Sequence, residues 1–265
     1  MAVHRLRPRP LPQEYRRHPV RFALHDFRQA GDYGAANKFL DGLGFVPQAV
    51  MSAVYPALSI AFTQGAAAVR PLYLRVYRLL ALVGMPASVL CVALAPAIVA
   101  DTHTLSTAVP SLRVLGGTAF FLFVVNSFVF TLGAMDRQLT FAALAGASVV
   151  VNVGLNLVLI PLFPFDQGPV ACAWATVVTE AVLFLAGLLL LSRYLGGLPW
   201  VRPLVPVALS GAAMAAVAWP LRDAAQPLAV CVPVAVYCAA VVVTGALRPA
   251  ELGPVLAAVR GRLGR

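Results

Sequence analysis

The stretch NVGLNLVLIPLF, residues 152–163, decides the fold of this chain. It lies in a segment without an ionisable side chain from Gln138 to Phe165, which is long enough for a helix to cross a bilayer. Asn152 and Asn156 are four residues apart, so a helix places them on one face, one above the other. An amide in hydrocarbon costs free energy unless it has a partner or water. We therefore expect this face to turn toward other helices or a cavity.

The rest of the chain is similarly apolar. Its 265 residues are 60% hydrophobic and 11% charged, with a mean hydropathy of +0.84. Soluble domains carry about 25% charged residues. Six windows have no charge, and a seventh contains one charge, Glu180. The predicted spans are Gly42–Val69, Leu79–Ala100, Val114–Met135, Gln138–Phe165, Gln167–Ser192, Pro203–Leu221 and Ala224–Leu247. This pattern predicts an all-α, polytopic membrane helix bundle with about seven transmembrane helices.

The placement of the basic residues predicts the orientation of the bundle. Of the 20 basic residues, 19 are arginine and one is Lys38. Ten arginines fall in or beside alternate connections and the C-terminal tail, whereas the other connections carry two, Arg113 and Arg222. Positive residues gather on the cytoplasmic side, so the C-terminus is expected in the cytoplasm and the chain in the cell (inner) membrane. The ten are Arg70, Arg75, Arg78, Arg137, Arg193, Arg202, Arg248, Arg260, Arg262 and Arg265. This placement explains the net charge of +10 without nucleic acid.

The first 33 residues differ from the remainder. They are rich in proline and arginine and have no apolar run, so they are neither a signal peptide nor a span. We expect a disordered tail over 1–33, a five-helix core over 34–195, an accessory helix pair over 196–248 and a basic cytoplasmic tail over 249–265. Seven spans would leave the first tail outside the cell, where arginines are disfavoured. Either one predicted span does not cross the membrane, or the chain is the C-terminal part of a longer protein. We favour the second explanation.

Polar side chains recur on single faces of several spans. At 100° per residue, Asp41, Gln48 and Tyr55 stay in one narrow sector of the first span, and Lys38 lies where it can pair with Asp41. Such stripes predict a water-accessible cavity, and ionisable groups within a membrane point to function. Hydrogen bonds between helices are the alternative. The candidate cavity residues are Lys38, Asp41, Gln48, Tyr55, Arg113, Asn126, Asn152, Asn156, Thr176 and Glu180.

The sequence contains few of the motifs that catalysis or metal binding requires. The four cysteines form no CxxC pair, and the four histidines are scattered outside the apolar windows. The sequence has no nucleophile elbow, no glycine-rich phosphate loop and no pair of carboxylates at a useful spacing. We therefore expect no catalytic residue, no metal, no cofactor and no enzymatic activity.

Three segments resemble a known family. They are GDYGAANKFLDGLGFVPQAVMSAVYPALS (31–59), NVGLNLVLIP (152–161) and GPVACAWATVVTE (168–180). Their order and spacing resemble the oligosaccharide flippase branch of the multidrug/oligosaccharidyl-lipid/polysaccharide exporter superfamily. That family has twelve to fourteen spans in two lobes around a cavity, and this chain would match spans eight to fourteen, the second lobe with its accessory helices. Where relatives often have Gly-Ala-Ala, this chain has Gly-Pro-Val-Ala from residue 168.

The resemblance implies transport of a lipid-linked oligosaccharide. A polyprenyl-pyrophosphate-linked glycan for polysaccharide or lipopolysaccharide synthesis would move to the outer leaflet by alternating access, with no bond made or broken. Lys38 and Arg113 are the cationic candidates for the pyrophosphate. The implied partners are membrane lipid, the glycan lipid, and a first-lobe polypeptide or a second copy of the chain.

Other functions stay open at this point. A multidrug or cation antiporter of the same superfamily would use carboxylates such as Asp41 and Glu180 in its cavity. An inert remnant, or half of a split transporter, would carry the same spans. A membrane glycosyltransferase or glycan polymerase is a weaker alternative, because it needs a catalytic carboxylate or a large loop outside the membrane.

Overall fold

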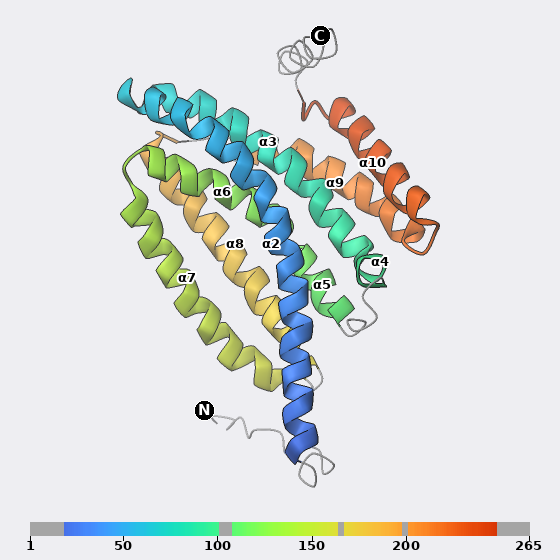
Figure 1. Ribbon diagram of the computed structural model, residues 1–265. Helices are drawn as coiled ribbons and strands as arrows, with labels where there is room; N and C mark the ends of the chain where they lie inside the picture. The colour runs from blue at the N-terminus through green and yellow to red at the C-terminus, as the bar shows by residue number, and fades with distance from the viewer. Residues whose placement is uncertain (1–18, 101–107, 164–166, 198–200, 248–265) are drawn as a thin grey trace, which may run out of the picture.

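The computed structural model describes residues 19–100, 108–163, 167–197 and 201–247, and within these ranges every regular element is a helix. The helices form one bundle (Figure 1). They are α2 (Pro19–Thr63), α3 (Ala66–Ala93), α4 (Ala95–Ala100), α5 (Val109–Gly116), α6 (Ala119–Ala134), α7 (Gln138–Leu159), the 3-10 turn η2 (Ile160–Leu162), α8 (Gly168–Tyr194), α9 (Val201–Leu221) and α10 (Gln226–Val243).

The predicted all-helical class is confirmed for the described residues, and the lengths of the helices fit a polytopic bundle. Six of the described helices are long and apolar enough to cross a membrane, and the bent pair α5–α6 makes a seventh if it counts as one span. The two members of this pair meet at 45°, around Gly117 and Thr118. The sequence predicted one continuous span from Val114 to Met135, which places the start of the helix too late and overlooks the bend.

The boundary between the first two spans was also predicted wrongly. α2 ends at Thr63, and Gly65 takes a left-handed φ of 103° before α3 begins at Ala66. The window Gly42–Val69 therefore runs across a turn. Arg70 and the other two arginines expected in a loop, at 75 and 78, lie inside α3 instead. Absence of charge does not mark where a helix ends, because arginine is a good helix former.

α2 starts earlier than expected. It is 45 residues long and begins at Pro19, so the described part of the expected disordered tail is helical and continuous with the first span. Residues 1–18, and the expected C-terminal tail over 249–265, lie outside the described residues. A span needs about 20 residues. α2 therefore has more length than one crossing requires, and its first turns extend beyond the other helices (Figure 1).

The core lies where α3, α6 and α8 pack together. The Tyr77 ring of α3 lies 6.2 Å from the Phe128 ring of α6, which lies 6.0 Å from the Phe184 ring of α8. Gly187 of α8 permits this approach, because a Cβ there would collide with the Phe128 ring. On α2, Met51 is fully buried against the same cluster. The aromatic packing joins α3, α6 and α8, and Met51 adds α2 to the same core.

Two edges flank this core. α7 has no buried residue and lies against α8 on one side of the bundle, while α9 and α10 lie on the other side (Figure 1). The Tyr237 hydroxyl of α10 donates to the Leu82 carbonyl of α3 over 2.8 Å. Ser210 of α9 and Thr244 beyond α10 share a hydrogen bond of 3.1 Å. The two hydroxyls thus join the end of α10 to α9.

The described arginines divide between the two ends of the bundle. At the end where α2 meets α3, Arg70 Nη2 donates to the Gly197 carbonyl over 3.1 Å. At the same end Arg137 lies over the Tyr194 ring at 5.2 Å. Arg113 and Arg222 both lie at the opposite end, beside Trp219 of α9. This division agrees with the asymmetry in the sequence, and which end faces the cytoplasm stays a prediction.

Candidate functional site

A line of polar side chains runs along α2 and is not covered by the described part of the chain. We call Lys38, Asp41, Gln48, Ser52 and Tyr55 the α2 stripe. All five are exposed, with Tyr55 at 38%. The buried side of α2 carries apolar residues, which are Ala36, Leu40, Pro47, Met51 and Leu58. The helix is thus apolar where it meets the bundle and polar on a neighbouring exposed sector.

The direction of the stripe is fixed by Tyr55. Its ring meets the Phe130 ring of α6 edge-on, with centroids 6.2 Å apart. A Cβ built on Gly133 would lie 3.6 Å from the Tyr55 ring. Both contacts are with α6. The stripe therefore lies on the flank of α2 next to α6, and not on the flank that faces away from the bundle.

Lys38 and Asp41 do not form the ion pair that their spacing allows. Asp41 Oδ2 instead lies 3.5 Å from the Asn37 amide, which is a long hydrogen bond. Among the residues with described side chains, the ion pair found is Arg222–Asp223. A pair on an exposed helix surface contributes little free energy, so its loss has a small cost. Lys38 is left as an exposed ammonium group on the stripe.

The two asparagines of the opening stretch face α8. Asn152 Nδ2 donates to Thr179 Oγ1 over 3.1 Å, and the Thr179 hydroxyl donates to the Ala175 carbonyl over 2.8 Å. Asn156 Nδ2 lies 3.0 Å from both the carbonyl oxygen and the side-chain oxygen of Asn152. The Asn152–Thr179 bond connects α7 to α8, whereas both contacts of Asn156 stay within α7. For Asn152 the structure supports helix association, the alternative that the sequence left open.

Thr176 and Glu180 occupy another face of α8. The Thr176 hydroxyl and the Tyr33 hydroxyl of α2 are 3.0 Å apart. Phe184, two turns later, packs its ring against Phe120 and Phe121 of α6. Residues four apart share a helix face, so Glu180 lies between a contact with α2 and a contact with α6. It is half-buried and makes no hydrogen bond or ion pair with the described residues.

Asn126 lies on the α2-facing side of α6, whereas Arg113 does not join this group. Asn126 Nδ2 donates to the Leu122 carbonyl over 2.8 Å, and Leu122 packs against Gly44 of α2. Arg113 of α5 instead lies 5.9 Å from the Trp219 ring of α9. Arg113 is therefore placed away from the polar residues with which the sequence grouped it.

The candidate residues thus separate into three places. The α2 stripe, Asn126, Thr176 and Glu180 lie on the side formed by α2, α6 and α8; Asn152 and Asn156 lie between α7 and α8; Arg113 lies near α9. Sequence reasoning missed the contacts of Tyr33 and Trp219. Tyr33 lies near the start of the segment that resembles the flippase family, nine residues before the first charge-free window, and an aromatic hydroxyl near the end of a span is a signal that could have indicated it.

No group of three histidine, cysteine or acidic side chains gathers to hold a metal within the described ranges. The long apolar helices indicate the class of multi-pass membrane proteins. Comparison with protein-family models, with curated proteins and with solved structures finds no match for this chain.

Proposed function

We propose that this chain is one body of a two-body flippase for a polyprenyl-pyrophosphate-linked oligosaccharide. The observation that carries the proposal is the exposed α2 stripe, which continues through the part of the helix, Gly42–Thr63, that has no charged side chain. In hydrocarbon, side chains such as Lys38, Asp41 and Gln48 need water or a protein partner. A second helical body facing α2, α6 and α8 would provide both, with a wet cavity between the two bodies. The resemblance of residues 31–59 and 152–180 to flippase segments supports the same reading.

The transport step follows from this arrangement. Alternating access works by rocking one body against another around a site at their interface. Lys38 offers an exposed cation, without an ion pair to any residue that the structure describes, for the anionic pyrophosphate. Gln48, Ser52 and Tyr55 offer hydrogen-bonding groups for sugar hydroxyls. Arg113 has no part in this step, since it lies with Trp219 on the far side of the bundle.

Complementation tests the proposal. A strain that lacks its oligosaccharide flippase would express the chain alone or together with the first lobe of a two-lobe flippase. We expect surface glycan to return when both are present, and Lys38→Gln to lower it. Arg75→Gln is the matched control, because Arg75 is equally exposed but lies on α3. Failure of every combination, with the chain present in the membrane, would refute a flippase role. If the chain alone restores surface glycan, the second body is a second copy of this chain.

A cation antiporter is the second candidate, favoured by one observation. Glu180 is a half-buried carboxylate without a partner among the described residues, and such a group can exchange protons or cations. The two functions respond differently to one substitution. Glu180→Gln would abolish drug or cation efflux in an antiporter and would leave glycan transport largely intact in a flippase.

A further inference from the structure

Trp219, near the end of α9, lies between two arginines. The guanidinium carbon of Arg222 is 4.4 Å from the centre of the Trp219 ring, and that of Arg113 is 5.9 Å from it. Both distances suit cation–π contact. Arg113 and Arg222 are also the two arginines that the internal connections carry at the end away from the arginine-rich one. The two arginines of these internal connections therefore lie beside one ring.

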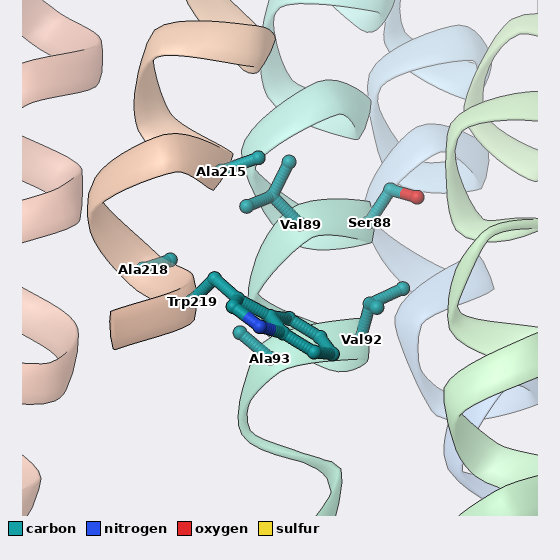
Figure 2. Close-up of a pocket in the computed structure, with 7 residues that line it drawn as sticks. All are labelled: Ser88, Val89, Val92, Ala93, Ala215, Ala218 and Trp219. Atoms are coloured by element: carbon teal, nitrogen blue, oxygen red, sulfur yellow. The ribbon is translucent and has the colours of Figure 1, made fainter. Parts of the chain in front are cut away.

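A pocket opens beside the same ring. It has a volume of about 160 Å³ between α3 and α9. Figure 2 shows Trp219 crossing from α9 toward α3, with Val89 and Ala215 above it. Ser88 and the indole N–H of Trp219 are the polar groups of the lining, and the Ser88 hydroxyl already donates to the Gly116 carbonyl over 2.8 Å. The other lining residues are valine and alanine, so most of the pocket wall is apolar. Its occupant should be hydrocarbon, because an apolar cavity excludes water.

The charge around Trp219 favours an anion next to that hydrocarbon. Asp223 binds Arg222 through a Nε–Oδ2 contact of 3.3 Å and offsets its charge. Arg113 has no acidic partner among the described residues, and its Nε is buried without a hydrogen-bond partner. The local sum of two arginines and one aspartate is +1. A buried donor without an acceptor costs free energy unless a ligand supplies one.

We propose that an acidic phospholipid binds here, with part of one acyl chain in the pocket and its phosphate at Arg113 and Arg222. The indole of Trp219 would lie at the level where tryptophans collect in bilayers, between headgroup and hydrocarbon. Anionic headgroups and basic side chains attract each other at this depth. This site is separate from the α2 stripe and does not depend on glycan transport.

Quenching of Trp219 fluorescence tests the site directly. In a full chain with Trp174→Phe and Trp200→Phe, Trp219 is the remaining tryptophan. It would be placed in phosphatidylcholine vesicles that contain rising fractions of brominated phosphatidylglycerol or brominated phosphatidylcholine. We expect half-quenching at a roughly fivefold lower fraction of the acidic lipid, as one net arginine charge implies. Arg113→Gln and Arg222→Gln should each remove this preference.

Two further variants and one competitor complete the test. Ala215→Leu fills the pocket and should reduce quenching by both lipids, while Arg202→Gln, at the other end of the bundle, should change nothing. Arg222 lies at a turn, so its variant decides the outcome if Arg113→Gln does not fold. Equal half-quenching fractions for the two lipids would overturn the proposal. Loss of the preference in millimolar inorganic phosphate would overturn it as well, since the site would then bind a free anion.

Discussion

The side-chain amide of Asn152 on α7 donates to the hydroxyl of Thr179 on α8 over 3.1 Å. α7 has no buried residue, although Phe141 and Leu144 near its start pack against the core. Helices in a membrane associate through close packing and hydrogen bonds between them. The Asn152–Thr179 bond is therefore a main polar link between α7 and the rest of the described bundle.

This link predicts an energetic coupling between the two residues. We expect Asn152→Ala and Thr179→Val to destabilise the fold singly, and to show a coupling energy of about 0.6–1.7 kcal/mol in a double-mutant cycle. The measurement is equilibrium unfolding in mixed micelles. Asn126→Ala combined with Thr179→Val is the control, because Asn126 bonds within its own helix. If the control pair shows an equally large coupling energy, the coupling between Asn152 and Thr179 does not arise from their hydrogen bond.

The crossing of α5 and α3 at Gly116 gives a second prediction. A Cβ at Gly116 would lie 2.9 Å from Cys91 Cβ and 3.0 Å from the Val92 nitrogen, and backbone cannot move aside as a side chain can. We expect Gly116→Ala to cost about 1–3 kcal/mol, the usual range for an overpacked core. Gly154 of α7 has nothing within 4 Å of its built Cβ, so Gly154→Ala should be neutral or stabilising. Thermal unfolding compares the two variants, and equal stability of both would contradict this packing.

The arginine asymmetry predicts which connections face the cytoplasm. In a cysteine-free background, single cysteines would replace four exposed glutamines at the two ends of the bundle. Those at Gln167 and Gln226 should react with a membrane-impermeant thiol reagent added outside the cell, and those at Gln64 and Gln138 should react after the membrane is opened. The reverse pattern would place the arginine-rich end outside and invert the proposed direction of glycan movement.

The sequence predicted the later spans better than the first three. From Gln138 onward, charge-free windows coincide with helices because each window ends at a turn marked by proline, glycine or charge. Between α2 and α3 the turn at Gly65 is apolar on both sides, and Arg70 then continues a helix instead of ending one. The bend between α5 and α6 had a local signal in the pair Gly116–Gly117, which hydropathy ignores.

The candidate site could be predicted from periodicity only as single helix faces. Helical periodicity predicted that Asn152 and Asn156 share a face of their helix, and they do. It could not name Thr179 as the partner, because that depends on how α7 and α8 cross. Arg113 shows the same limit. Its position near the start of a span suggested the cavity, but the bend after α5 and the packing of α9 place it beside Trp219.

Water accessibility of the α2 stripe tests the central claim most directly. Cysteines at Gln48 and Ser52 would be compared with cysteines at Val46 and Ala53, which are also exposed but lie on the other flank of α2, away from the stripe. A small charged thiol reagent reacts with thiolate, which forms in water and not in lipid. With the second body present, we predict modification of the stripe positions and protection of the apolar ones. Equal protection of all four would contradict a wet cavity along α2 and, with it, the transport function proposed for this chain.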